Sequence, residues 1–235
     1  KYYFGIPKDD FIISDSGIIS LKQKGLLEKT SPLFIIAFLT FFLNNIAKYG
    51  IDYFYDDETQ AYFGFITLPM FVIEMVSGFI YQPKFANMSS LWLEGKVKQF
   101  IKEALKQILY ILFISVICLI GIWFFGVPIL SAVFATNLDA YRFDLAIGII
   151  GGSAVAFLIY FSALLTIMRR QKIQLFIYGI SAILGAVFIW LSVSRLGIRG
   201  GTIGNLIVFS VQALFMFIAV VFLVMKRKGE NFSIN

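Results

Sequence analysis

Six long apolar stretches constrain the fold of this sequence more than any other feature. They cover about residues 32–51, 62–82, 107–131, 145–168, 173–194 and 203–225. A bilayer core about 30 Å thick is crossed by roughly 20 apolar residues in a helix, so each stretch is long enough to span it. Strands would leave backbone groups unpaired in lipid, and the sequence lacks the alternation typical of a membrane β-barrel. We therefore predict an all-α integral membrane protein with six transmembrane helices.

The composition agrees with this fold and excludes several classes of function. Of the 235 residues, 59% are hydrophobic and 14% are charged, whereas soluble domains have about 45–50% apolar and about 25% charged residues. The chain has no histidine, which excludes Ser-His-Asp catalysis and His-ligated zinc. Its single cysteine, Cys118, cannot form an intrachain disulfide. We predict no enzymatic activity, no metal and no cofactor.

The basic residues predict how the chain is oriented in the membrane. If residues 1–30 lie in the cytoplasm, the segments on that side hold every Lys and Arg except Lys48, Arg142, Arg195 and Arg199. Cytoplasmic loops of membrane proteins carry an excess of Lys and Arg. We therefore predict a multi-pass protein of the cytoplasmic membrane with both termini in the cytoplasm. This distribution explains the net charge of +6 without a nucleic-acid partner.

Aromatic residues and one amphipathic segment are expected at the membrane interfaces. Trp123 and Trp190 fall at predicted outer ends of spans, and Trp92 marks the inner side. Segment 92–106 has apolar residues on one helical face and lysines on the other. It is interpreted either as a helix lying along the inner leaflet, bound to anionic lipid, or as an extension of the neighbouring span.

A polar stripe runs along the first apolar stretch. Thr40, Asn44, Lys48 and Asp52 recur every four residues, and Asn45 lies beside them. Such a spacing places the side chains on one helical face, and lipid offers them no partner. The stripe therefore points into a cavity or a helix interface, where Lys48 could bind an anionic substrate. Alternatively, Lys48 extends to the outer interface and pairs with Asp52.

Glu74 is the only acidic residue deep within an apolar stretch. Ionisable groups in the membrane are costly and are therefore candidates for function. Glu74 is interpreted either as a coupling-ion site for H⁺ or Na⁺, or as a structural hydrogen-bonding group. Gly148 and Gly152 form a small-xxx-small pair that predicts close helix packing. Pro69 predicts a kink in the second span.

Two stretches resemble the oligosaccharide flippases of the multidrug, oligosaccharidyl-lipid and polysaccharide exporter superfamily. Residues 32–83 resemble the seventh and eighth helices of these proteins. The residues that carry this resemblance are Asn44, Asn45, Lys48, Tyr49, Asp52, Gln60, Tyr62, Phe63 and Gly64. Residues 196–205, LGIRGGTIGN, are similar to the glycine-rich entry to the last helix of each lobe. The resemblance covers about residues 26–228.

This resemblance implies that the chain is the C-terminal lobe of a two-lobe exporter. Residues 1–30 would be the cytoplasmic connection to an N-terminal six-helix lobe, 31–227 the lobe itself and 228–235 a cytoplasmic tail. The chain begins with Lys1 rather than Met, which agrees with a part of a longer protein. The implied activity is the translocation of undecaprenyl-diphosphate-linked oligosaccharide units across the membrane. Lys48, Asn44, Asn45 and Asp52 would then bind substrate, and Glu74 would bind the coupling ion.

Three other functions remain open at the level of the sequence. A drug or cation antiporter of the same superfamily would use Glu74 and would not need Lys48. A membrane-embedded glycan polymerase would need acidic or basic residues on a large outer loop, but the longest outer loop, about residues 132–144, has only Asp139, Arg142 and Asp144. A scaffold without transport activity is disfavoured by the polar stripe.

Overall fold

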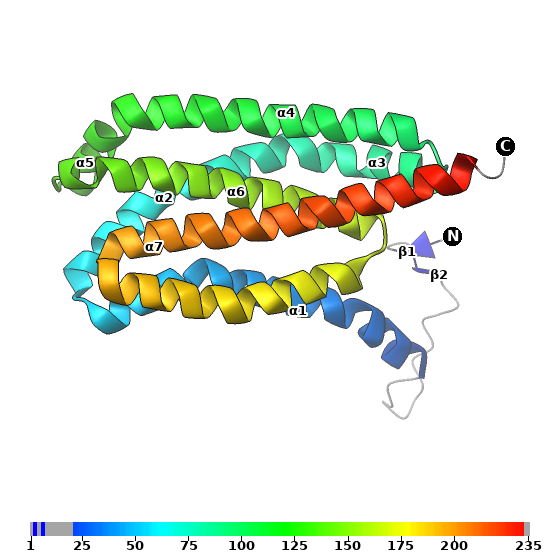
Figure 1. Cartoon of the computed structure of the whole chain (residues 1–235), viewed down its shortest axis with the longest axis horizontal. Helices are drawn as coiled ribbons and strands as arrows, with labels where there is room; N and C mark the ends of the chain where they lie inside the picture. Colours follow the sequence, from blue (N-terminus) through cyan, green and yellow to red (C-terminus); the bar gives the residue numbers. More distant parts are fainter. Residues whose placement is uncertain (1, 4–5, 8–20, 233–235) are drawn as a thin grey trace.

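The computed structural model describes residues 2–3, 6–7 and 21–232, with side chains for residues 31–229 (Figure 1). Two short strands, β1 (Tyr2–Tyr3) and β2 (Ile6–Pro7), pair antiparallel. The rest of the described chain is helical apart from short connections. Most of the predicted connection at residues 1–30 lies outside the described residues, and its last ten residues already belong to the first helix.

Seven α-helices follow one another along the chain. They are α1 (Leu21–Phe54), α2 (Asp57–Tyr81), α3 (Phe85–Leu93), α4 (Val97–Gly121), α5 (Val127–Phe134), α6 (Arg142–Ile167) and α7 (Gln171–Phe232). Short helices η2 (Gln82–Lys84), η3 (Ile122–Gly126) and η4 (Asp139–Tyr141) join some of them. Within the described residues, five helical segments are long and apolar enough to cross a membrane. The prediction of an all-helical membrane protein is thus compatible with the structure.

The longest helix, α7, bends back on itself at Gly197. This residue has φ 56° and ψ −131°, a left-handed conformation that favours glycine. We call residues 171–196 the first limb and residues 198–232 the second limb. The limbs run side by side in opposite directions (Figure 1), and Gly204 of the second limb lies against Ile189 of the first. The fifth and sixth predicted stretches are therefore two limbs of one bent helix.

The connections gather at two opposite ends of the molecule (Figure 1). At one end α3 meets α4, α6 meets α7, and α7 terminates. We call this the basic end because its connections carry Lys96, Arg169 and Arg170. At the other end, the loop end, α1 meets α2, α5 meets α6 and α7 bends. The segregation of basic residues to one end agrees with the pattern on which the predicted orientation rests.

Aromatic residues lie at both ends, as the sequence predicts. At the loop end the Trp190 ring lies 5.3 Å from that of Tyr53 and 5.1 Å from that of Phe54. At the basic end the Arg227 guanidinium lies 4.2 Å from the centre of the buried Trp92 ring. A cation over an indole face is attracted by the ring quadrupole, so this contact holds the end of α7 against α3.

The core surrounds α6, while α4 lies at the periphery. Of the 18 most apolar consecutive residues in the segment that contains α6, 72% are buried. The corresponding share for the segment that contains α4 is 17%. The exposed surface is itself apolar: Phe34, Phe113 and Phe222 are each at least 65% exposed. A water-soluble protein rarely exposes apolar patches of this extent. The exposed faces are suited to the hydrocarbon of a bilayer.

Segment 92–106 does not form a separate helix along the membrane surface. Trp92 belongs to α3, a turn at Gly95 (φ 73°) follows, and residues from Val97 onward continue into α4. The prediction of a surface helix is therefore wrong, and the alternative of an extended neighbouring helix describes the structure. The apolar face of this segment, including Val97 and Phe100, packs inward instead of lying on lipid.

Candidate functional site

A small polar cavity lies where α1, α2, α6 and the second limb of α7 meet. Its volume is about 30 Å³. Five polar side chains line it: Asn44, Lys48, Thr67, Glu74 and Asn205. Polar groups inside an apolar helical bundle are costly unless they have partners, and they are functional candidates by default. This cavity is therefore the candidate functional site.

Helical spacing and one close helix contact position these groups. Asn44 and Lys48 are one turn apart on α1, and Thr67 and Glu74 are two turns apart on α2. A Cβ atom at Gly152 of α6 would lie 2.9 Å from the Met70 backbone. Only glycine fits such a close approach, so α6 packs directly on α2 beside the cavity. The predicted packing role of Gly152 is confirmed.

The contacts inside the cavity leave both charged groups without an ion pair. The Lys48 ammonium lies 5.6 Å from the centre of the Phe71 ring. Among the described residues, neither Lys48 nor Glu74 has an oppositely charged group within 4.0 Å. The Thr67 hydroxyl donates to the Phe63 carbonyl oxygen at 2.9 Å. Opposite charges thus share the cavity without direct contact.

The structure brings together three of the five predicted site residues and separates the other two. Asn44, Lys48 and Glu74 line the cavity. The Asn45 amide instead donates to the Phe41 carbonyl oxygen of its own helix at 2.8 Å. Asp52 is exposed and makes no ion pair with Lys48. The alternative in which Lys48 pairs with Asp52 is therefore wrong, while the functional roles of these residues stay predictions.

Two buried amides on the second limb of α7 were not identified from the sequence. Asn205 is 4% exposed, and its Oδ1 atom has no hydrogen-bond partner within the described part of the chain. Gln212, two turns further on, is fully buried, and both polar atoms of its side chain lack partners there. Both are polar residues within an apolar stretch, and that signal could have identified them.

An ion pair at the loop end ties α6 to the start of the second limb. The Arg199 Nε atom lies 3.4 Å from Asp144 Oδ1, and the Thr202 hydroxyl donates to the same oxygen at 3.4 Å. Asp144 is buried in the first turn of α6, where the helix dipole also favours its negative charge. Asp144 therefore belongs to α6, not to the predicted outer loop, and its carboxylate holds α6 to the second limb of α7 at this end of the molecule.

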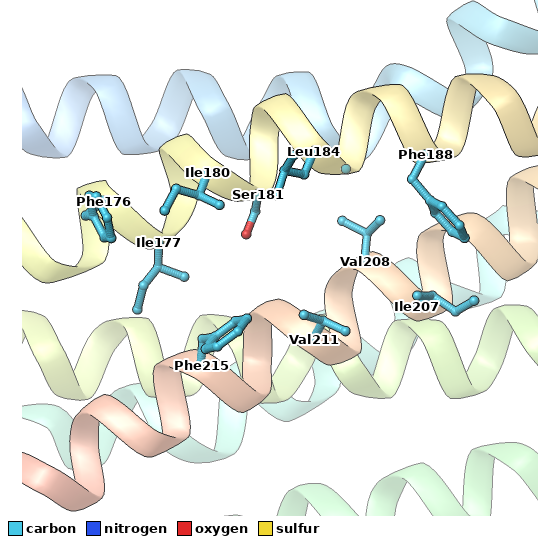
Figure 2. A pocket seen from close by; sticks show the side chains of 11 residues that line it. Phe176, Ile177, Ile180, Ser181, Leu184, Phe188, Ile207, Val208, Val211 and Phe215 are labelled. Carbon is cyan, nitrogen blue, oxygen red and sulfur yellow. The ribbon is translucent and has the colours of Figure 1, made fainter.

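A larger groove of about 310 Å³ lies between the two limbs of α7 (Figure 2). Phe176, Ile180, Leu184, Phe188, Val211 and Phe215 are among its lining residues. Ser181 is its only polar lining side chain, and its hydroxyl points into the groove (Figure 2). The groove holds no charged group, so it is suited to hydrocarbon and offers no chemistry for binding a charged substrate.

Neither a metal centre nor a known relative identifies this site. Across the described residues, no three His, Cys, Asp or Glu side chains lie close enough together to hold a metal ion. Comparison of the chain with protein-family models, curated proteins and solved structures gave no match. The physical chemistry of the polar cavity is therefore the basis for a functional proposal.

Proposed function

We propose that the chain is the C-terminal lobe of an exporter similar to the oligosaccharide flippases. It would translocate undecaprenyl-diphosphate-linked oligosaccharide units across the cytoplasmic membrane by alternating access, in polysaccharide biosynthesis. The observation that carries the proposal is the position of Lys48 in a small cavity with other polar side chains, at the edge of an apolar helical bundle. Partial desolvation of an ammonium group in such a place costs free energy. Charge-assisted hydrogen bonds to a bound diphosphate would offset that cost.

The proposed topology has six crossings with both termini in the cytoplasm. Each limb of α7 is long enough to span a bilayer by itself, because 20 helical residues reach about 30 Å. Together with α1, the α2–α3 segment, the α4–α5 segment and α6, the two limbs make six crossings. The basic end would face the cytoplasm, as the positive-inside rule requires.

A second six-helix lobe is part of the proposal. The cavity, at about 30 Å³, has room for roughly two water molecules and none for a sugar. Lys48 and Glu74 are only half-buried. They therefore lie at the edge of the lobe and are not enclosed by it. A second lobe packed against this edge would complete a larger cavity that opens alternately to each side.

The residues of the cavity have distinct proposed roles. Lys48 binds the diphosphate by charge-assisted hydrogen bonds, with the amides of Asn44 and Asn205 as additional polar partners. Glu74 is the site of the coupling ion. Asn45 and Asp52 lie outside the cavity, and the geometry supports no role for them in binding.

A drug or cation antiporter is the second candidate, and the observation that favours it is Glu74. This carboxyl group lines the same cavity and has no cationic side chain within 4.0 Å among the described residues. An organic cation could bind beside the Glu74 carboxylate. The two functions differ in which charged residue the transported molecule needs.

A transport assay tests the proposal. The protein is reconstituted into vesicles together with any further segment that belongs to it in the cell. The substrate is a fluorescent undecaprenyl-diphosphate oligosaccharide, and the readout is its appearance in the opposite leaflet. We expect Lys48→Gln to reduce the rate at least about tenfold, because a charge-assisted contact of about 1.5–3 kcal/mol is lost. The matched control, Lys102→Gln, removes an exposed lysine of α4 and should leave the rate unchanged.

The outcome also separates the two candidates. Transport that survives Lys48→Gln but is abolished by Glu74→Gln, with organic cations as the moved species, would support the antiporter. Failure of the wild-type protein to move the lipid-linked sugar would remove the flippase proposal.

A further inference from the structure

The groove between the two limbs of α7 lies open on the surface of the bundle. Its lining residues Phe176, Leu184 and Phe215 are exposed, and none of its lining side chains is charged. The limbs diverge toward the basic end (Figure 1), where Phe176 and Phe215 form the mouth of the groove. In a bilayer such a surface is covered by hydrocarbon, so the groove is suited to a lipid chain.

Small residues of the first limb make room between the limbs. A Cβ atom at Gly185 would lie 2.7 Å from Val208 Cγ1, so the limbs touch at this point. One turn toward the basic end, Ser181 presents only a hydroxymethyl group to the groove (Figure 2). A lipid chain in this hollow contacts both limbs and gains dispersion energy that a chain on a flat helix surface lacks.

The length of the groove matches one leaflet of a bilayer. Phe176 and Phe188 line opposite ends of the groove and lie about 18 Å apart along the first limb. One leaflet contributes about 15 Å to a bilayer core. A single acyl chain from the leaflet at the basic end therefore fills the groove along its length.

Two lysines lie beyond the mouth of the groove without acidic partners. Lys172 precedes Phe176 by one turn on the same helical face, about 6 Å closer to the basic end. Lys226 shares the face of Phe215 on the second limb, because the eleven residues between them make about three turns. Both lysines are exposed, and among the described residues neither has a carboxylate within 4.0 Å.

The charge of α7 selects the kind of headgroup. The helix carries no acidic residue between Gln171 and Gly229. Basic pockets between membrane helices attract acidic lipid headgroups. The choline ammonium of phosphatidylcholine is instead repelled by the lysines, and this repulsion offsets part of the attraction of its phosphate. The groove and its mouth together therefore favour a lipid with a net negative charge.

We propose that the groove binds one acyl chain of an anionic phospholipid whose phosphate is bound by Lys172 at the basic end. Lys226 adds to the positive potential from the second limb. The chain occupies the hollow beside Ser181 and contacts both limbs, so the lipid links them on the side where they diverge. The inference does not depend on which molecule the protein transports.

Quenching of tryptophan fluorescence by brominated lipids tests the site. The protein, with any further segment that belongs to it in the cell, is placed in phosphatidylcholine vesicles that contain brominated phosphatidylglycerol or brominated phosphatidylcholine. The reporter is Phe176→Trp at the mouth of the groove. The matched control is Phe113→Trp on α4, which is 65% exposed compared with 68% for Phe176 and lies outside the groove. In both, the native residues Trp92, Trp123 and Trp190 are replaced by phenylalanine.

We expect phosphatidylglycerol to quench Phe176→Trp more strongly than phosphatidylcholine at equal concentration. Adding Lys172→Gln should lower this preference about fivefold, because a lysine at the membrane surface loses its attraction for an acidic lipid. Adding Lys226→Gln should lower it by less. Lys102→Gln removes an exposed lysine of α4 and should leave it unchanged. Phe113→Trp also follows a row of lysines but has no groove, and it should show little preference.

A second measurement keeps the native tryptophans. Native mass spectrometry in detergent counts the phosphatidylglycerol molecules retained by each chain. Wild type and Lys102→Gln should retain one, whereas Lys172→Gln should lose it. Ser181→Leu, which fills the hollow and keeps every lysine, should lose it as well.

Four results would overturn the proposal. They are equal quenching of Phe176→Trp by the two lipids, an equal anionic preference at Phe113→Trp, and retention of the lipid by Ser181→Leu. The fourth is displacement of phosphatidylglycerol by undecaprenyl diphosphate at equal concentration, which would assign the groove to the transported lipid. Absence of any quenching at Phe176→Trp would show that protein covers the groove, and it would exclude a lipid there too.

Discussion

Asp144 and Arg199 form an ion pair whose two partners differ in burial. The Asp144 side chain is 3% exposed, whereas that of Arg199 is 55% exposed. Removing the arginine leaves a buried carboxylate with the Thr202 hydroxyl as its remaining side-chain partner. Removing the carboxylate charge leaves a guanidinium that water can solvate. The two halves of the pair should therefore contribute unequally to stability.

We predict that Arg199→Gln lowers the free energy of unfolding by about 1–2 kcal/mol and that Asp144→Asn lowers it by less. The double variant should cost less than the sum of the two, because each removes the same contact. Arg142→Gln is the control, since it breaks an exposed pair with Asp139 and should cost almost nothing. Thermal and denaturant unfolding in detergent, followed by tryptophan fluorescence, measures these differences. Equal costs for Arg199→Gln and Arg142→Gln would refute the prediction.

Gly200 is the glycine with the closest approach to another part of the backbone. A Cβ atom there would lie 2.0 Å from the Ser192 carbonyl oxygen across the bend of α7. We predict that Gly200→Ala destabilises the protein by about 1–3 kcal/mol, because the limbs must separate to admit a methyl group. Gly179→Ala on the first limb, with open space around it, should be neutral or slightly stabilising. Parallel melting curves of the two variants provide the check.

At the scale of the helices, α2 begins with a defined cap. The Asp56 Oδ1 atom accepts a hydrogen bond from the Thr59 hydroxyl at 2.5 Å and another from the Thr59 backbone N–H at 2.9 Å. These bonds favour the ionised carboxyl group and hold the pKa of Asp56 below its ordinary value of 3.8. The cap fixes where α2 starts and hence where Thr67 and Glu74 fall along the membrane.

The Asp56 cap predicts a defined pH dependence. A folded-state pKa below the unfolded value of about 3.9 stabilises the folded state above that value, and the contribution disappears as pH falls through the folded pKa. Asp56→Ala should therefore melt at a lower temperature than wild type near pH 6. The difference should shrink as the pH falls below the unfolded pKa and through the lower folded pKa. Asp57→Asn in the same turn serves as the control, and a difference that persists at low pH would speak against capping by the carboxylate.

The bend of α7 can be tested by a cross-link between its limbs. A Cβ atom at Gly204 would lie 3.7 Å from the Ile189 Cβ, within the 3.5–4.5 Å typical of disulfides. In a straight helix these two positions would be about 22 Å apart. In a Cys118→Ala background, the pair Ile189→Cys and Gly204→Cys should oxidise to a disulfide seen by mass spectrometry. The pair Ile183→Cys and Gly204→Cys should not, and no cross-link in the first pair would exclude the bend.

Sequence patterns predicted the helices well and their connections less well. Runs of apolar residues with helical spacing place α6 and the first limb of α7 within three residues of their bounds. The second limb extends further than predicted at both ends, because its polar ends carry no apolar signal. Such runs could not place the start of α1 at Leu21, because the polar residues before Ser31 carry no apolar signal. Segment 92–106 was ambiguous because an amphipathic face packs equally well on lipid or on a neighbouring helix, and only tertiary contacts decide between them.

At the scale of the whole molecule, sequence patterns predict the local relations within the candidate site but not its contacts between helices. Helical spacing correctly placed Asn44 and Lys48 on one face, because that relation is local. The meeting of Lys48 with Glu74 and Asn205 depends on how α1, α2 and α7 pack, which no local pattern encodes. The stripe to which Asp52 was assigned ends at the surface, since α1 extends past the core at the loop end.

The exporter proposal requires that the basic end and the loop end lie on opposite sides of a membrane. Single cysteines introduced in a Cys118→Ala background, as Asp57→Cys at the loop end and Arg170→Cys at the basic end, test this requirement. Both positions are exposed. A membrane-impermeant maleimide applied to intact cells should label position 57 and should reach position 170 only after the membrane is permeabilised. Labelling of both positions from the same side would contradict the account.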